Sequence, residues 1–363
     1  MTAAPTVPLA KRLAHMKSSS TLRVLQITER LRAEGIDVIS LGAGEPDFPT
    51  PENIKHAAMT AIDAGFTKYT SAGGIADLKR AIIERIRRDF GGDYGPEETI
   101  ATVGGKQAIF EAIAAIIDPG DDVLLPAPYW VTFPEVVNFA GGRSVIIDTE
   151  PTGFGLTADM VAAHITPKTK LIIVNSPNNP TGRIVAPDEM RKIVEIAAEN
   201  DAWVLSDDCY LYFVYPPVHP YSVASLPDEL RQRCMITGSF SKTYAMTGWR
   251  IGYALGPNEW IQGMLTIQSH STSNPTSISQ YAAIEAFAGK QDSVREMLAE
   301  YQRRRDWLVP ALNELPGVSC VMPEGAFYAF PNVRELLDDR IPTSRALADK
   351  LAEESAVGVT PGA

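Results

Sequence analysis

Short runs of aliphatic and β-branched residues alternate with helix-like segments through the middle of the chain, and this alternation limits the possible folds strongly. Runs with the length and composition of buried strands lie at 99–103, 122–127, 144–149, 170–177, 202–210 and 234–240. Between them, 106–117 and 187–201 carry apolar residues at helical spacing. Strands that alternate with helices form a mainly parallel sheet covered by helices, so we expect an α/β fold.

Polar clusters follow several of these predicted strands at their carboxyl ends. Gly104 and Gly105 come directly after one strand, the turn-rich segment "SPNNPTG" ends another, and Asp207 and Asp208 end a third. In open α/β sheets, ligands bind at the carboxyl ends of the strands. We therefore expect a site at this edge of the sheet.

The two ends of the chain have a different pattern of predicted helices and strands from its middle. Residues 294–315 predict one long amphipathic helix, 317–333 a pair of antiparallel strands, and 344–355 a closing helix. We expect a large cofactor-binding domain over 46–289. The smaller α+β domain is expected from 1–45 together with 290–363.

Composition excludes several classes of partner. The net charge of −11 over 363 residues, without a long basic run, argues against nucleic acid as the main partner. No stretch approaches the ~20 apolar residues of a membrane span, and the N-terminus lacks a secretory apolar region. Scattered histidines argue against a metal site. Scattered cysteines predict reduced thiols and a cytoplasmic protein: Cys209, Cys234 and Cys320.

The segment "SFSKTYAMTGWR", residues 239–250, places Lys242 among hydroxyl side chains. A single lysine is most often a solvated surface residue. The S-x-x-K spacing also matches an acylating serine, but the K-T-G partner motif of that class is absent from the sequence. A third interpretation makes Lys242 the amine that forms a Schiff base with a carbonyl cofactor, pyridoxal phosphate.

A phosphate group needs hydroxyls, backbone amides at a helix start and a forked cation. Ser239 and Ser241 flank the lysine, and Arg250 follows it. Gly104 and Gly105, ahead of a predicted helix, allow the backbone to approach a phosphate closely. These residues form the candidate phosphate site.

The cofactor ring makes separate demands, and the sequence offers a residue for each. Asp207 suits the ring nitrogen, because a buried carboxylate strengthens a pair with a cation. Tyr210 and Asn179 suit the ring oxygen, and Trp130 suits stacking on the ring. Each motif alone has a structural explanation as a turn, a cap, a solvated strand end or a core aromatic. Their joint occurrence at strand ends favours the cofactor.

Several stretches together resemble the class I aminotransferases, and more narrowly the bacterial-type aspartate aminotransferase subgroup. In chain order they are "LGAGEPDFPTP", "KYTSAGG", "TVGGKQAI", "SPNNPTG", "SDDCY" and "SFSKTYAMTGWRIGY". The resemblance runs from about residue 10 to the end of the sequence. It implies a fold-type I pyridoxal-phosphate enzyme, and a homodimer with active sites at the subunit interface.

The resemblance also implies a role for individual residues. Lys242 would be the Schiff-base lysine, Asp207 the partner of the ring nitrogen, and Tyr210 with Asn179 the contacts of the ring oxygen. The first three are the expected catalytic residues. Further residues would bind the phosphate or border the substrate: Ser239, Arg250 and the backbone at Gly105 for the phosphate, Tyr69 for the phosphate of the neighbouring subunit, and Gly44, Trp130 and Asn179 for the substrate.

Two departures from the family pattern stand out. The family usually has Asp-Glu where this chain has Asp207 and Asp208, a change that we expect to leave the nitrogen partner undisturbed. Members also continue beyond the "GVTPG" turn to an arginine that binds the substrate's α-carboxylate. Arg334, Arg340 and Arg345 do not match that motif, and we expect the sequence to be a truncated record.

The expected reaction is transamination from L-aspartate to 2-oxoglutarate. A dicarboxylic substrate needs a second cation, for which Lys106 is the first candidate and Lys17 the second. Lys106 also belongs to the expected cofactor site. Aromatic or prephenate substrates, a C–S β-lyase, a Claisen-type synthase and an inactive cofactor-binding fragment remain as alternatives.

Overall fold

The computed structural model describes residues 7–10, 12–13, 16, 20–42 and 44–362. Its main element is a seven-stranded sheet, with the strand order β2-β8-β7-β6-β5-β3-β4 among the described residues. The strands are β2 (Thr99–Thr102), β3 (Asp122–Ala127), β4 (Arg143–Asp148), β5 (Thr169–Asn175), β6 (Trp203–Asp207), β7 (Cys234–Ser239) and β8 (Gly252–Leu255). Neighbouring strands pair in parallel except where β8 meets β2 and β7. The expected α/β fold with a mainly parallel sheet is confirmed.

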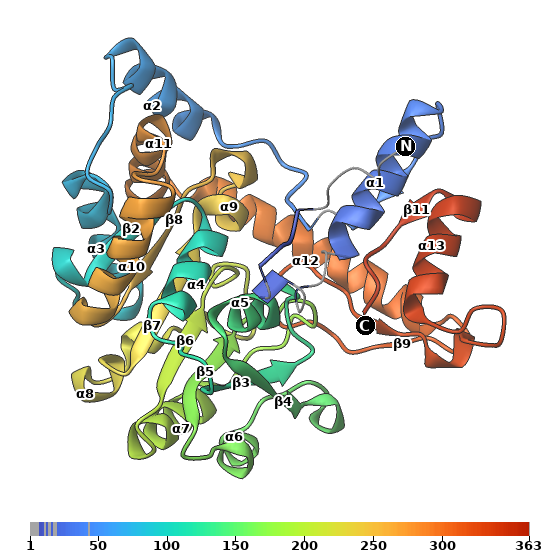
Figure 1. Ribbon diagram of the computed structural model, residues 1–363. Helices are drawn as coiled ribbons and strands as arrows, with labels where there is room; N and C mark the ends of the chain where they lie inside the picture. The colour runs from blue at the N-terminus through green and yellow to red at the C-terminus, as the bar shows by residue number, and fades with distance from the viewer. Residues whose placement is uncertain (1–6, 11, 14–15, 17–19, 43, 363) are drawn as a thin grey trace, which may run out of the picture.

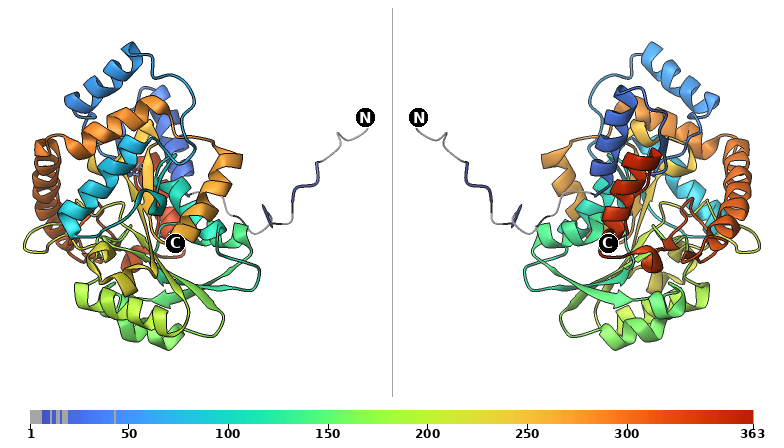
Figure 2. Two further views of the ribbon diagram at one scale, coloured as in Figure 1. Left: turned by 90° about the vertical axis from the view of Figure 1, so that its left-hand side faces the viewer. Right: turned by 90° about the vertical axis from the view of Figure 1, so that its right-hand side faces the viewer.

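Helices cover both faces of this sheet (Figure 1 and Figure 2). The α-helices of this region are α2 (Glu52–Asp63), α3 (Ala76–Phe90), α4 (Gly105–Ala114), α5 (Thr132–Ala140), α6 (Ala158–His164), α7 (Pro187–Glu199), α8 (Asp228–Arg231), α9 (Phe240–Thr243), α10 (Asn258–Ser271) and α11 (Ser277–Ala288). Of these, α2 packs on α11. The predicted strands all form, whereas β8, a short run after a turn-rich segment, was not predicted.

Alternation along each strand creates the two layers of the core. On β3, Leu124 belongs to the core layer that also contains residues of α3 and α7, whereas Val123 and Leu125 belong to the opposite layer, with residues of α4, α5 and α10. Successive side chains point to opposite faces of a strand, so a strand buried on both faces is apolar throughout. This is why the strand segments of the sequence contain so few polar residues before their ends.

The two ends of the chain meet away from the sheet. Near the N-terminus lie α1 (Ser20–Ala33) and β1 (Ile39–Ser40), and near the C-terminus α12 (Asp292–Asn313), β9 (Ser319–Cys320), β10 (Pro331–Asn332), α13 (Ser344–Ser355) and β11 (Val357–Gly358). The strands β1 and β11 pair in parallel, and α1 contacts α13 (Figure 1). The predicted antiparallel pair is present but short, as β9 with β10. The domain boundaries at 46 and 289 stay a prediction.

Within the described part of the chain, no helix combines the length and the low charge needed to cross a bilayer.

Candidate active site

Lys242 lies on α9, the single helical turn that follows β7. Ser239, the last residue of β7, caps this turn, because its Oγ accepts a hydrogen bond from the Ser241 amide at 3.0 Å. The Lys242 Nζ donates to the carbonyl oxygen of Gly44 at 2.5 Å. Removal from water lowers the pKa of this amine, and the nearby charges of Arg250 and Lys106 lower it further. The chain thus holds a half-buried amine whose pKa lies below that of a solvated lysine.

Asp207 ends β6, beside the last residue of β5. It is 4% exposed, and its carboxylate accepts hydrogen bonds from the Cys209 amide and from the Asn175 Nδ2, each at 3.2 Å. Burial raises the pKa of Asp207 to about 7. Among the described residues, no basic side chain forms an ion pair with it. A buried carboxyl group in this situation is stabilised as an anion by any cation that enters the site.

Asp208 contacts two serine hydroxyls and does not share the partners of Asp207. Its two oxygens accept hydrogen bonds from Ser206 at 2.6 Å and from Ser222 at 2.7 Å. Burial raises the pKa of Asp208 to about 7 as well. The residue that departs from the family pattern therefore contacts Ser206 and Ser222, while Asp207 contacts Asn175.

Tyr210 and Asn179 lie together, with a third residue that sequence reasoning missed. The Tyr210 hydroxyl is 2.5 Å from the hydroxyl of Tyr328, and Asn179 Nδ2 lies 3.4 Å from the first and 3.3 Å from the second. Tyr328 is far from Tyr210 in sequence, so only the folded chain reveals the contact. Asn175, also missed, accepts a hydrogen bond from the Asn179 amide at 2.7 Å and thereby connects this group to Asp207.

A cradle of backbone surrounds the start of α4. Gly104 has φ 81° and ψ 164°, and a Cβ there would lie 2.5 Å from Nη2 of Arg250. A Cβ on Gly105 would lie 3.1 Å from the Cβ of Ser239, and one on Gly252 would lie 2.6 Å from the Gly105 amide nitrogen. Only glycine gives these segments such a close approach. The amide groups at the start of α4 therefore lie beside Ser239 and Arg250.

Arg250 and Lys106 bring positive charge to this cradle. The guanidinium of Arg250 donates to the carbonyl oxygen of Thr247 at 2.9 Å, just after the short turn Thr247–Trp249. The Lys106 Nζ lies 4.9 Å from the centre of the Trp130 ring. Partial removal from water and the charge of Arg250 lower the pKa of Lys106. Trp130 is placed beside Lys106, and its stacking on a cofactor ring stays a prediction.

The segment that carries Gly44 is tied down along its length. Glu45 accepts a hydrogen bond from Thr247 at 2.8 Å. Asp47 accepts two from the guanidinium of Arg304, at 2.9 and 3.0 Å. Gly44 has φ 59° and approaches the Tyr328 hydroxyl so closely that a Cβ would lie 3.3 Å from it. These contacts fix the Gly44 carbonyl over Lys242.

Other predicted residues lie apart from this cluster. Tyr69 is 90% exposed, so within this chain its side chain is directed to solvent. Lys17 lies outside the described residues. Arg334 pairs with Glu150 at 2.7 Å, and Arg340 pairs with Asp338. These two arginines are bound to surface carboxylates, in keeping with the absence of an assigned role.

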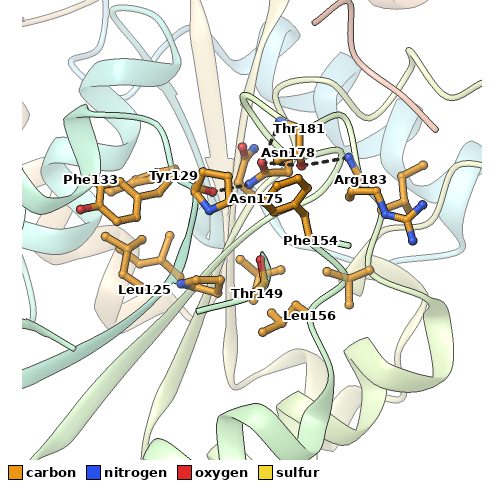
Figure 3. Close-up of a pocket in the computed structure, with 16 residues that line it drawn as sticks. Leu125, Tyr129, Phe133, Thr149, Phe154, Leu156, Asn175, Asn178, Thr181 and Arg183 are labelled. Atoms are coloured by element: carbon orange, nitrogen blue, oxygen red, sulfur yellow. Dashed lines mark hydrogen bonds between the residues drawn. The ribbon is translucent and has the colours of Figure 1, made fainter. Parts of the chain in front are cut away.

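A separate recess lies beside the site, at the ends of β3 and β5 (Figure 3). It has an empty volume of about 460 Å³, with Asn175, Asn178, Thr181 and Arg183 among its polar lining residues. Asn178 accepts a hydrogen bond from the Thr181 hydroxyl at 2.9 Å, as the close-up shows. Lys242 does not line this recess, which shares Asn175 with the site around Asp207.

These features fit pyridoxal phosphate. Asp207 is a buried carboxyl group that lacks a cation among the described residues, and the ring nitrogen supplies one when it is protonated. The glycine cradle leaves the α4 amides, Ser239 and Arg250 open to a phosphate, which a helix start stabilises. Lys242 follows β7, which lies in the sheet between β6, the strand that ends at Asp207, and β2, the strand that precedes α4.

Known proteins resemble this chain over nearly all of its length. The family model "Aminotransferase class I and II" matches residues 36–363. An "Aspartate/prephenate aminotransferase" of Cereibacter sphaeroides is 46% identical, with 98% of this chain and 91% of the relative covered. An "Aspartate aminotransferase" of Geobacillus stearothermophilus is 43% identical, with the same shares covered.

Solved structures agree with these sequence matches. The aspartate aminotransferase of Rhizobium meliloti has a TM-score of 0.92 at 40% identity, with 98% of this chain and 91% of that chain covered. The enzyme of Thermus thermophilus with maleate has a TM-score of 0.91 at 41% identity, with 98% and 92% covered. The chain therefore belongs to the class I and II aminotransferase family, and it is a pyridoxal-phosphate-dependent transaminase.

Proposed function

We propose that this transaminase moves the amino group of L-aspartate to a 2-oxo acid, with 2-oxoglutarate as the expected acceptor, and that pyridoxal phosphate is attached at Lys242. The observation that carries the proposal is the half-buried Lys242 amine, which donates to the Gly44 carbonyl at 2.5 Å and whose pKa is lowered. An amine in its neutral form is both a nucleophile towards a carbonyl group and a base for proton transfer.

The surrounding residues support this assignment through the groups that they offer. Asp207 would hold the proton of the ring nitrogen, and Tyr210 with Asn179 would donate hydrogen bonds to the ring oxygen. The α4 amides, Ser239, Ser241 and Arg250 would bind the phosphate. When bound, the cofactor supplies an electron-withdrawing ring that stabilises negative charge on the substrate's α-carbon.

Lys242 would act on the proton at that carbon. Once the substrate's amino group takes the place of the lysine, the freed amine lies within the site as a general base. Partial removal from water and the charges of Arg250 and Lys106 lower the pKa of this amine, which favours the form that accepts the proton. The Gly44 carbonyl would then orient the amine by accepting one of its hydrogens.

Aspartate is supported by Lys106 and by the names of the relatives. Both curated relatives described above carry aspartate in their names. A dicarboxylic substrate needs a cation for its second carboxylate, and Lys106 lies beside both Trp130 and Arg250. We propose Lys106 as that cation, with Trp130 and Gly44 at the border of the substrate.

Prephenate is a second candidate as the oxo-acid partner. The relative from Cereibacter sphaeroides, at 46% identity, is named for prephenate as well as aspartate. Prephenate also carries two carboxylates, so the same Lys106 would serve it. Measured rates with 2-oxoglutarate and prephenate as acceptors would separate the two.

A homodimer completes the proposal. Tyr69 is 90% exposed in this chain, which leaves its hydroxyl available to a second subunit. We propose that it reaches the phosphate of the cofactor in that subunit. A Tyr69→Phe variant should bind the cofactor more weakly without a change in its own fold.

Addition of L-aspartate to the purified holoprotein tests the reaction. The cofactor's absorbance should change, oxaloacetate should form, and Lys242→Ala should abolish turnover. Release of pyruvate and ammonia instead would identify a lyase. Equal turnover by the Ala variant would contradict the role of Lys242.

A further inference from the structure

Tyr328 extends from the loop between β9 and β10 into the site. The loop is fixed by backbone contacts with the segment after β6: the Ala326 amide donates to the Phe213 carbonyl at 2.7 Å, and the Tyr215 amide donates to Glu324 at 2.8 Å. The Tyr328 and Tyr210 rings meet edge to face, with centroids 5.4 Å apart and an interplanar angle of 78°. The position of the Tyr328 hydroxyl is therefore set by the fold.

The two phenols of this group have one more proton than their mutual hydrogen bond uses. Asn179 Nδ2 contacts both phenol oxygens, at 3.4 Å to Tyr210 and 3.3 Å to Tyr328. The two hydroxyls share one contact of 2.5 Å, which uses only one of their two protons. Burial raises the pKa of both phenols, so both keep their protons at neutral pH. One phenol proton remains for a further acceptor.

A hydrogen-bond acceptor placed beside Tyr210 determines which of the two phenols donates in the contact between Tyr210 and Tyr328. If Tyr210 donates outward, Tyr328 must donate to the Tyr210 oxygen, because each phenol has a single proton. A hydroxyl that receives a hydrogen bond becomes a stronger donor, since bonds in a chain polarise one another. A negatively charged acceptor gains most from such a chain.

We propose that Tyr328 is a positioning residue that donates to the Tyr210 oxygen and thereby strengthens and aims the Tyr210 hydroxyl at the cofactor's ring oxygen. This inference rests on the proposed function, in which Tyr210 contacts that oxygen. Tyr328 itself acts through Tyr210. The chain of donors runs from Tyr328 to Tyr210 and then to the ring.

The pH at which the bound cofactor's absorbance changes provides the test. A donor to the ring oxygen stabilises its negative charge, so the bound cofactor loses its titrating proton at a lower pH. Tyr328→Phe removes one hydroxyl and keeps the ring. We expect the midpoint of the absorbance titration in the holoprotein to rise by roughly 0.5 pH unit.

The other titratable groups around the pair stay in place in this variant. They are Asp207 and Cys209 at the end of β6, Tyr301 on α12, and Lys242, whose Nζ lies 5.9 Å from the centre of the Phe327 ring. Tyr301→Phe is a matched control. Its ring lies 5.2 Å from that of Phe327, and its buried hydroxyl has no hydrogen-bond partner among the described residues. This control should leave the midpoint unchanged.

The same substitution made in a Tyr210→Phe variant shows whether Tyr328 acts through Tyr210. In Tyr210→Phe holoprotein, the further change Tyr328→Phe should shift the midpoint by much less than it does in the wild type. A midpoint that is unchanged or lowered in Tyr328→Phe alone would overturn the inference, as would an equal shift in both backgrounds.

A separate measurement distinguishes failure of the proposed function from failure of the inference about Tyr328. A separate sample of each holoprotein is reduced with borohydride, and its labelled peptide is identified. A label absent from Lys242 in the wild type overturns the proposed function, and the inference with it. A label on Lys242 with no shift in the titration overturns the inference alone.

Discussion

Gly104→Ala tests the cradle at the start of α4 with a single methyl group. Gly104 has φ 81° and ψ 164°, a region that is essentially restricted to glycine. A side chain forced into such a region costs about 1–3 kcal/mol of stability. The new Cβ would also lie 2.5 Å from Nη2 of Arg250, so the guanidinium must move away.

In the proposed site, displacement of Arg250 would remove a charge-assisted hydrogen bond from the cofactor's phosphate. Such bonds contribute about 1.5–3 kcal/mol, and each 1.4 kcal/mol is a factor of ten in the dissociation constant. We therefore expect the cofactor's dissociation constant to rise by about ten- to a hundredfold. Titration of the apoprotein with pyridoxal phosphate, followed by absorbance, measures it.

Gly120→Ala separates this effect from backbone strain. Gly120 also has a positive φ, of 103°, but a Cβ there would have no heavy atom within 4 Å. The control should lower the midpoint of thermal unfolding and leave the cofactor's dissociation constant within about twofold. If Gly104→Ala binds the cofactor as tightly as Gly120→Ala does, the cradle is not the phosphate site.

Two further changes test the carboxylate and the cation of the site. Burial raises the pKa of Asp207 to about 7, above the value of about 3.9 in an unfolded chain, so its contribution to stability is present at low pH and is lost as the pH rises towards 7. Apoprotein with Asp207→Asn should accordingly lose less thermal stability between pH 4 and pH 8 than the wild type, and an equal loss in both would contradict the assigned shift. Lys106→Gln should raise the KM for L-aspartate by about tenfold or more, through the loss of a charged contact. A monocarboxylic amino acid should be affected much less, and an equal change for both would remove Lys106 from substrate recognition.

The sheet was predictable because each strand carries its own signal. The runs at 122–127 and 234–240 are largely apolar on both faces. The glycines after 99–103 and the carboxylates near the end of 202–210 mark the edge where ligands bind. The strand β8 was missed, since its four residues include a glycine and follow a turn. Its place between β2 and β7 depends on pairing with distant strands, which no local pattern records.

The residues of the site also divide into those with a local signal in the sequence and those without one. Residue type and order were enough to predict the chemistry of the motifs that contain Lys242, Asp207 and Arg250. Tyr328 had no such signal, because an aromatic residue after glycine, alanine and phenylalanine is typical of a packed strand. Its contact with Tyr210 arises from a tertiary approach of two loops over 118 residues of chain, so it required the structure.

Chemical trapping of the cofactor gives the most direct measurement. Holoprotein is reduced with borohydride and digested, and the peptide that carries the pyridoxyl label is sequenced by mass spectrometry. The label should lie on Lys242, within the segment 239–250, at close to one per chain. A label on Lys106 or on any other lysine, or no label at all, would contradict the proposal that the half-buried amine on α9 holds the cofactor.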